Sequence, residues 1–167
     1  MTATVFIVGA VGTTGLEIAD RLAGRAEFDL IVLDDERRKD AGARREALNE
    51  ADFAILCLPD DAAREAVTLI DPACGTRVID ASTAHRVATG WTYGFPELVG
   101  RAVVAKADRV SNPGCYSTGF IALLAPLVRA GLLPADWPYT CNAVSGYSGG
   151  GKSLIARFEQ DRDIAWR

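Results

Sequence analysis

The chain has 167 residues, a net charge of −4, a pI near 5.0 and 49% apolar side chains. This composition suffices for a packed core and contains no basic tract, so it excludes nucleic acid and anionic membrane surfaces as expected partners. No apolar run approaches the roughly 18 residues that a membrane-spanning helix needs, and residues 1–4 lack the features of a signal peptide. We therefore expect a cytoplasmic protein without membrane or nucleic-acid partners.

Short apolar runs rich in β-branched residues alternate with helical patterns along the first two thirds of the chain. Strands are predicted over 4–8, 30–33, 53–58 and 78–79, with a further strand ending at Ser111. Residues 87–108 contain three glycines and a proline and are expected to be irregular. The alternation is typical of an α/β fold with a Rossmann-type parallel sheet and helices on both faces.

The last third of the chain has a different pattern. A helix is predicted from Cys115 to about Ala130, a strand over 140–144, and a final helix after Lys152. Residues 113–167 hold too few elements to bury a core of their own. We therefore predict a nucleotide-binding domain over 1–112 and an incomplete second domain over 113–167, as part of a longer protein.

A glycine-rich loop separates the first strand from the first helix. It contains Gly9, Gly12 and Gly15, with Thr13 and Thr14 between the last two. In such a loop the glycines permit a tight turn, close approach of backbone to a pyrophosphate, and close helix–strand packing. The loop therefore predicts a dinucleotide site.

Charged residues after the second strand point to both forms of the cofactor. An acidic residue here hydrogen-bonds the ribose of NAD, whereas an arginine accommodates the 2′-phosphate of NADP. The chain offers Asp34 and Asp35 and then the basic run Arg37, Arg38 and Lys39. The spacing alone leaves the choice open.

Cys115 lies between a predicted strand and a predicted helix, in Asn112-Pro113-Gly114-Cys115-Tyr116. Free N–H groups and the helix dipole at a helix start favour a thiolate, which is a strong nucleophile. Asn112 and backbone N–H groups there are candidates to stabilise an oxyanion. Cys115 is therefore the candidate catalytic residue.

The other cysteines are expected to be unreactive or without a role. Cys57 and Cys141 fall in predicted apolar strands, and Cys74 falls in a turn. Without a CxxC pair and with a single histidine, the chain is not expected to bind a metal or to form disulfides.

Polar residues after the fourth strand fall at the carboxyl edge of the sheet, where ligands bind in such folds. Ser82 is a candidate cofactor contact. Arg86 is a candidate for holding an anionic substrate, with a surface ion pair as the open alternative. His85 lacks an orienting partner in the sequence, so a solvent-facing or hydrogen-bonded structural histidine is expected rather than a general base.

A second glycine-rich loop precedes the last helix. Its hydroxyls and backbone N–H groups are suited to an anion. Ser145 and Gly146 are candidate substrate contacts, and Ser148 and Gly149 candidate cofactor contacts. Gly146 to Ser153 also matches the P-loop spacing, but the dinucleotide loop and the thiol argue against a nucleoside triphosphatase.

Taken together, these motifs resemble N-acetyl-γ-glutamyl-phosphate reductase of arginine biosynthesis, in its shorter bacterial form, within the semialdehyde dehydrogenase superfamily. Further matching stretches are 38–40, 54–59, 80–82 and 93–98. The resemblance implies an α+β catalytic and dimerisation domain after the Rossmann domain, NADP(H) as cofactor, and a homo-oligomer, either a dimer or a tetramer.

The resemblance also implies a reaction. Cys115 would displace phosphate from an acyl phosphate, and hydride from NADPH would reduce the resulting thioester to the semialdehyde. The histidine that the family uses as acid/base has no counterpart in this chain, so residues 1–167 alone are expected to turn over poorly. The alternatives are a non-catalytic nucleotide-binding or thiol redox module, and an enzyme like aspartate-semialdehyde dehydrogenase.

Overall fold

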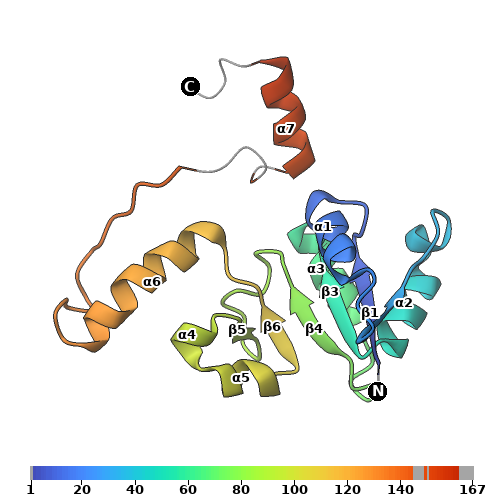
Figure 1. Cartoon of the computed structure of the whole chain (residues 1–167), viewed down its shortest axis with the longest axis horizontal. Coiled ribbons are helices and arrows are strands. Elements are labelled where there is room, and N and C mark those ends of the chain that lie inside the picture. Colours follow the sequence, from blue (N-terminus) through green and yellow to red (C-terminus); the bar gives the residue numbers. More distant parts are fainter. Residues whose placement is uncertain (1, 145–148, 150, 162–167) are drawn as a thin grey trace. The chain divides into compact units, whose positions relative to one another are not determined.

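The computed structural model describes residues 2–144, 149 and 151–161. These residues fall into two compact units, divided between Pro134 and Ala135. Figure 1 shows the order of the elements along the chain. The strands are β1 (Ala3–Val8), β2 (Phe28–Ile31), β3 (Phe53–Leu56), β4 (Arg77–Asp80), β5 (Thr92–Tyr93) and β6 (Arg109–Ser111). The helices are α1 (Thr13–Leu22), α2 (Ala41–Glu50), α3 (Asp60–Thr68), α4 (Pro96–Val99), α5 (Arg101–Lys106), α6 (Cys115–Arg129) and α7 (Gly151–Gln160), with a 3-10 turn over Arg37–Lys39.

All six strands of the first unit form one parallel sheet in the order β2-β1-β3-β4-β6-β5. The α/β class and the Rossmann-type sheet are therefore confirmed. Because the strands run parallel, the loops that follow β1, β3, β4 and β6 all leave from the carboxyl edge of the sheet, where the candidate residues lie.

One face of the sheet carries the main core. Phe6 and Val8 of β1, Ala54 and Leu56 of β3 and Val78 of β4 pack with α2 and α3. Small residues on the helices, such as Ala47 and Ala63, let the helices approach the sheet closely, and both are almost fully buried. Burial of these apolar side chains is the main favourable term in the stability of the unit.

Hydrogen-bonded side chains tie the ends of the two core helices together. Asn49 at the end of α2 donates to the carbonyl of Leu69 over 2.9 Å and accepts from the N–H of Asp71 over 2.6 Å. The Thr76 hydroxyl contacts the carbonyl oxygens of Leu48 and Ala51 at 2.9 Å each. These bonds satisfy backbone groups at the helix ends, which would otherwise be costly to bury.

Three predictions about the elements are wrong. Residues 87–108 are not irregular, because they contain β5, α4 and α5. Pro96 stands at the start of α4, where its missing N–H costs nothing, and Gly100 takes a φ of +97° between α4 and α5. The second and third strands end at Ile31 and Leu56 rather than at residues 33 and 58, because their pairing with β1 ends at the Phe6–Ile31 and Val8–Leu56 pairs.

The strand predicted over 140–144 is the third error. These residues are exposed and not in a strand. Within the described residues no strand pairs with them, and a lone strand leaves its backbone N–H and C=O groups without ladder partners. Of the other predicted elements, the helix from Cys115 is confirmed and ends at Arg129.

Within the part of the chain that is described, no helix is long and apolar enough to cross a membrane. The same residues contain no cluster of three or more His, Cys, Asp or Glu side chains suited to a metal ion.

Candidate functional site

In the turn between β1 and α1, backbone atoms of different segments lie in close contact with one another. Gly9 has a φ of +86°, and a Cβ there would lie 2.3 Å from the carbonyl oxygen of Cys57. A Cβ on Gly15 would lie 2.4 Å from the carbonyl oxygen of Gly9. Both positions therefore require glycine, the first for conformation and both for space.

The same turn leaves the start of α1 open. Gly12 is the N-cap residue, with φ −77° and ψ 165°, and no side chain caps the helix. Thr13 and Thr14 form its exposed first turn. The first N–H groups of a helix have no intrahelical partner and attract an anion, so this turn fits the predicted pyrophosphate site.

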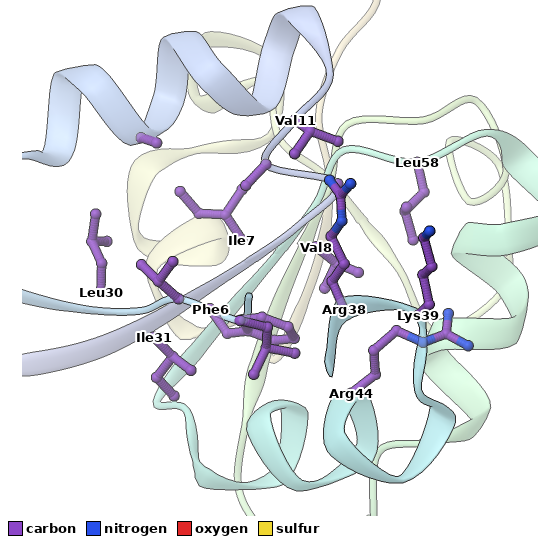
Figure 2. A pocket seen from close by; sticks show the side chains of 15 residues that line it. Phe6, Ile7, Val8, Val11, Leu30, Ile31, Arg38, Lys39, Arg44 and Leu58 are labelled. Atoms are coloured by element: carbon purple, nitrogen blue, oxygen red, sulfur yellow. The ribbon is translucent and has the colours of Figure 1, made fainter. Parts of the chain in front are cut away.

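A pocket of about 370 Å³ lies beside this turn. It is lined by Gly9, Ala10 and Val11 of the turn, by 30–33, by Leu58, and by three basic residues, Arg38, Lys39 and Arg44. Figure 2 shows the apolar side chains on its walls and the basic side chains at one side. An apolar cleft with cations at its rim suits the adenosine portion of a nucleotide that carries an extra phosphate.

The three basic residues are held differently. Arg38 pairs with Asp35 over 3.2 Å, and Arg44 pairs with Glu65 over 3.2 Å while its Nε is buried without a hydrogen-bond partner. Lys39 makes no ion pair within the described residues. Lys39 and Arg44 therefore join Arg38 as candidate phosphate contacts. The position of Arg44 on α2 carried no signal in the sequence.

The structure separates Arg37 from Arg38. Arg37 pairs with Glu46 over 3.0 Å and does not line the pocket, so its predicted cofactor contact is not supported. Asp34 accepts hydrogen bonds from the N–H groups of Glu36 and Arg37 at 3.1 and 2.8 Å. These bonds give Asp34 a role in shaping the turn after β2.

Cys115 is the first residue of α6 and is exposed. Gly114 is the N-cap, with φ −77° and ψ 156°, and again no side chain caps the helix. Thr118 donates its backbone N–H and its hydroxyl to the Gly114 carbonyl over 2.9 and 2.7 Å. The predicted helix-start position of the thiol is therefore confirmed.

Asn112 and Arg86 flank this helix start. Asn112 is exposed and donates its backbone N–H to the Asp80 carbonyl over 2.7 Å, which ties the segment before Cys115 to the end of β4. The Arg86 guanidinium lies against Gly114, where a Cβ would be only 2.5 Å from Nη1. The fold thus brings Arg86 to the residue before Cys115, although the two are 29 positions apart in the chain.

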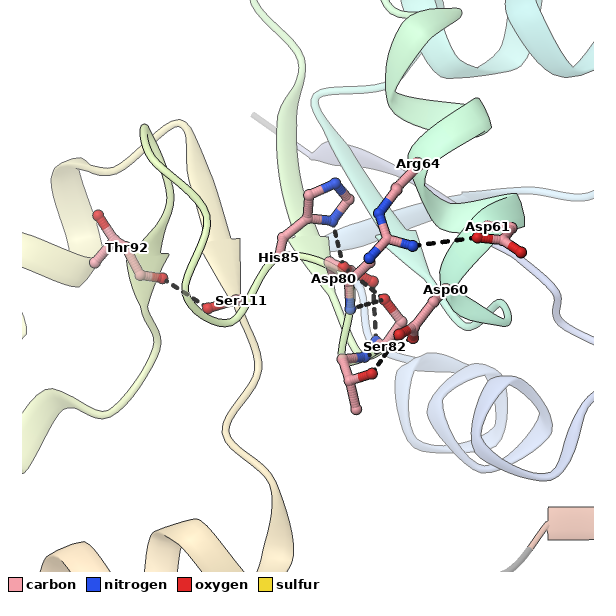
Figure 3. Close-up of polar contacts among 10 residues, drawn as sticks. Asp60, Asp61, Arg64, Asp80, Ser82, His85, Thr92 and Ser111 are labelled. Atoms are coloured by element: carbon pink, nitrogen blue, oxygen red, sulfur yellow. Dashed lines mark hydrogen bonds and ion pairs between the residues drawn. The ribbon is translucent and has the colours of Figure 1, made fainter.

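A buried polar cluster stands behind Arg86. Asp80 is fully buried and accepts from Ser82 N–H and Oγ at 2.9 and 2.8 Å. Its Oδ2 also lies 2.6 Å from Nδ1 of His85, as Figure 3 shows. His85 is therefore a hydrogen-bonded structural histidine, one of the two forms expected.

The Ser82 hydroxyl donates to Asp80 and accepts from the N–H of Ala84 within this loop, which does not favour its predicted cofactor contact. The sequence did not single out Asp80 as the centre of this cluster.

Burial raises the pKa of the Cys57 thiol from 9.0 to about 11, and the nearby charge of Asp80 acts in the same direction. This agrees with the unreactive role expected for Cys57. Cys141, by contrast, is exposed, so the buried strand setting expected for it is wrong.

The remaining predicted contacts lie in the second unit. Ser145, Gly146 and Ser148 fall outside the described residues. Gly149 is described and exposed, and its cofactor contact stays a prediction.

Two family models match the chain in sequence order. The NAD binding domain of semialdehyde dehydrogenase matches residues 40–107, and the dimerisation domain of semialdehyde dehydrogenase matches residues 115–162. The first match falls in the sheet, and the second begins at Cys115.

Curated relatives match over almost the whole chain. The chain is 60% identical over 161 residues to the N-acetyl-gamma-glutamyl-phosphate reductase of Chelativorans sp., a match that covers 95% of this chain and 52% of that protein. It is 59% identical over 162 residues to N-acetyl-gamma-glutamyl-phosphate reductase 2 of Pseudomonas putida, covering 95% and 51%. The chain thus spans about half the length of the curated relatives it matches.

Solved structures share the fold. The aspartate semialdehyde dehydrogenase of Francisella tularensis matches with a TM-score of 0.68 at 16% identity, over 97% of this chain and 50% of that one. The Vibrio cholerae aspartate semialdehyde dehydrogenase II matches with a TM-score of 0.64 at 17% identity, over 96% and 51%. At this identity the likeness concerns the fold alone.

Proposed function

Since the chain belongs to the semialdehyde dehydrogenase family, we propose that its protein is an NADPH-dependent reductase that converts N-acetyl-γ-glutamyl phosphate to the semialdehyde. The observation that carries this proposal is the exposed Cys115 at the start of α6 with the Arg86 guanidinium against the preceding Gly114. A nucleophile beside a cation suits an acyl phosphate, whose carbonyl carbon is attacked while its phosphate is held by the positive charge. The similarity to reductases at 59–60% identity supports this choice of substrate over aspartyl phosphate.

Cys115 begins the reaction. Its thiolate attacks the acyl carbon, a C–S bond forms, the C–O bond to phosphate breaks, and inorganic phosphate leaves with the electron pair. Arg86 offers its charge to the phosphate, while the open N–H groups of α6 and the Asn112 amide stabilise the oxyanion. The product is a thioester on Cys115.

The glycine turn and the pocket beside it fit NADPH. The uncapped start of α1 at Gly12 suits the pyrophosphate, and Arg38, Lys39 and Arg44 suit the 2′-phosphate. When bound, NADPH supplies the hydride that reduces the thioester. Collapse of the thiohemiacetal then returns the electron pair to the Cys115 sulfur and releases the aldehyde.

Assembly and location belong to the same proposal. The match to a dimerisation domain supports a homo-oligomer, a dimer or a tetramer. Exposed apolar side chains of α6 agree with it, since Leu123 and Leu127 are 72% and 40% exposed. The two domains, 1–112 and 113–167, and the cytoplasmic location expected from the sequence are retained as parts of the proposal.

The reverse reaction tests the proposal. Protein of the full length of its relatives is assayed for phosphate-dependent reduction of NADP⁺ by N-acetylglutamate semialdehyde, with aspartate semialdehyde in a parallel assay. We expect turnover with the acetylated substrate only. Turnover with aspartate semialdehyde alone would favour the related dehydrogenase, and cofactor binding without turnover would favour a non-catalytic module.

The 167-residue chain provides a second comparison. We expect it to bind NADPH, because the glycine turn and the basic pocket lie in the first unit. We expect slow turnover, because the His85 side chain is hydrogen-bonded to Asp80 and is not free to act as the general acid/base. A positioned acid/base typically contributes about 10²–10⁴-fold to the rate. Activity equal to that of the longer protein would contradict this expectation.

A further inference from the structure

The Arg86 side chain lies close to the helix start and, among the described residues, forms neither an ion pair nor a hydrogen bond through its Nε. Its Nε is buried and makes no hydrogen bond. Among the described residues, Arg86 is in no ion pair. A half-buried guanidinium in this state is costly unless an anion arrives to pair with it. Asp60 attracts the Arg86 charge without forming an ion pair with it. The contacts of the surrounding residues must therefore fix the guanidinium in place.

The backbone that carries Arg86 is fixed from the sheet side. Asp80 binds Ser82 through two hydrogen bonds and His85 through a third, all within five residues of sequence. The His85 ring stacks on Trp91, with ring centroids 4.1 Å apart and an interplanar angle of 11°. This loop has one buried anchor on the residue directly before Arg86, as the dashed lines in Figure 3 show.

A second anchor holds the middle of the loop from α3. Asp60 accepts from the backbone N–H of Thr83 over 3.0 Å and from the Thr83 hydroxyl. The hydrogen bond from the Thr83 hydroxyl is the largest cause that lowers the pKa of Asp60 below 3.8. Asp60 therefore stays ionised near neutral pH and keeps both bonds.

Gly114 limits the guanidinium from the other side. A Cβ at this position would lie 2.5 Å from Nη1 and 3.0 Å from Cζ of Arg86. The backbone of Gly114, at φ −77° and ψ 156°, is one that any residue adopts. A side chain at position 114 would therefore displace the Arg86 guanidinium, whereas the backbone conformation itself does not need glycine.

From these contacts we propose that Asp80, His85 and Gly114 are positioning residues that fix the Arg86 guanidinium beside Cys115 and so decide where an anionic group is held. The inference rests on the proposed function for the identity of that anion, the phosphate of an acyl phosphate. The buried Asp80–His85 pair and the glycine at position 114 thereby gain a role in substrate placement.

Alkylation of Cys115 tests the proposal without turnover. Iodoacetate and iodoacetamide react in the same way, by displacement of iodide, but only iodoacetate brings a carboxylate to the site. The ratio of their rates at Cys115, measured by peptide mapping, reports the positive charge beside the thiol. We expect Arg86→Met to lower this ratio by about fivefold or more, the effect of one nearby charge at a protein surface.

Gly114→Ala should lower the ratio as Arg86→Met does, because the new methyl group displaces the guanidinium. The matched control is Gly119→Ala in the same helix, where a Cβ meets nothing within 4 Å. We expect this control to keep the ratio of the unchanged protein. An unchanged ratio in Gly114→Ala would overturn the role given to Gly114.

Two variants test the histidine. His85→Phe keeps a ring for stacking on Trp91 but loses the bond to Asp80, and it should lower the ratio. His85→Asn keeps a hydrogen-bond donor near the position of Nδ1, so its rate ratio of iodoacetate to iodoacetamide should be close to that of the unchanged protein. If His85→Phe fails to fold by circular dichroism, Gly114→Ala still decides the proposal from the other side of Arg86.

Steady-state kinetics of the full-length protein separate positioning from a merely structural role. We expect His85→Phe and Gly114→Ala to raise KM for the acyl phosphate more than they lower kcat. An equal loss of NADPH affinity would point to general damage and contradict the proposal. If the alkylation ratios behave as expected and turnover with this substrate is absent, the proposed function fails while the positioning of Arg86 stands.

Discussion

The starts of α1 and α6 look alike in backbone and differ in what lies against them. Each follows a strand of the parallel sheet and has a glycine N-cap, with φ −77° and ψ 165° at Gly12 and φ −77° and ψ 156° at Gly114. Neither has a side-chain cap, so both leave N–H groups open to an anion. In the first, the glycine turn packs against backbone, whereas in the second a side chain from a distant loop, Arg86, occupies the space.

Two helix starts of similar backbone are thus set apart by the side chains around them. The α1 start is made from one short stretch of sequence, so its shape is set locally and suits a pyrophosphate of any dinucleotide. The α6 start adds a thiol and a guanidinium, so it suits an anion that is to react.

Replacing the Cys115 thiol should abolish the nucleophile at the start of α6. For Cys115→Ser in the full-length protein we expect kcat/KM to fall on the order of 10⁴- to 10⁶-fold, as for other covalent nucleophiles. NADPH affinity, measured by fluorescence titration, should remain, since the cofactor residues belong to the α1 start. Cys74→Ser is the control. Residual activity within tenfold of the unchanged protein would contradict a thioester route.

Labelling should separate the thiols by their surroundings. Cys57 has a pKa of about 11, and since only the thiolate reacts, its reactive fraction at pH 8 is about 100-fold below that of a thiol at 9.0. Its labelling rate should rise with pH until about 11. Cys115 should react with iodoacetamide faster than Cys57. Because Cys74 and Cys141 are also exposed, faster labelling of Cys141 than of Cys115 would show that the α6 start does not activate its thiol.

Gly15→Ala should break the α1 start. The methyl group would lie 2.4 Å from the Gly9 carbonyl oxygen, and such overpacking costs about 1–3 kcal/mol of unfolding free energy. Gly12→Ala is the matched variant, because its nearest atom is 3.3 Å away. Urea denaturation of both variants measures the difference. Equal stabilities would mean that the turn moves aside more easily than this packing indicates.

Arg38→Ala should weaken the preference for NADPH over NADH. Loss of a hydrogen bond between charged groups costs about 1.5–3 kcal/mol, so the ratio of the two Kd values should change by roughly tenfold or more. Arg37→Ala, whose side chain pairs with Glu46 away from the pocket, should leave the ratio within about twofold. Calorimetric titration of both cofactors decides between them. Equal effects would restore Arg37 to the site.

Some of the site was predictable because it depends on neighbours in sequence. The spacing of Gly9, Gly12 and Gly15 after an apolar run indicated the turn, and Gly114-Cys115 before an apolar helix indicated an open helix start. Both features are local, since a helix start is defined by the residues that enter it. The parallel sheet followed in the same way from alternating strand and helix patterns.

Other parts required the tertiary structure. Adjacent Arg37 and Arg38 look equivalent in sequence, yet the 3-10 turn sends one to Glu46 and the other to the pocket. The strand predicted over 140–144 lacks a described partner, and pairing between strands is not a local property.

Local sequence patterns were enough to predict the class of fold, the glycine turn and the place of Cys115 at a helix start, because each depends on backbone conformation over a few consecutive residues. The contact of Arg86 with Gly114 and the place of Arg44 in the pocket beside the glycine turn could be seen only in the tertiary structure. These contacts join residues from separate loops and helices, and they exist because parallel strands bring their carboxyl-end loops to one edge of the sheet.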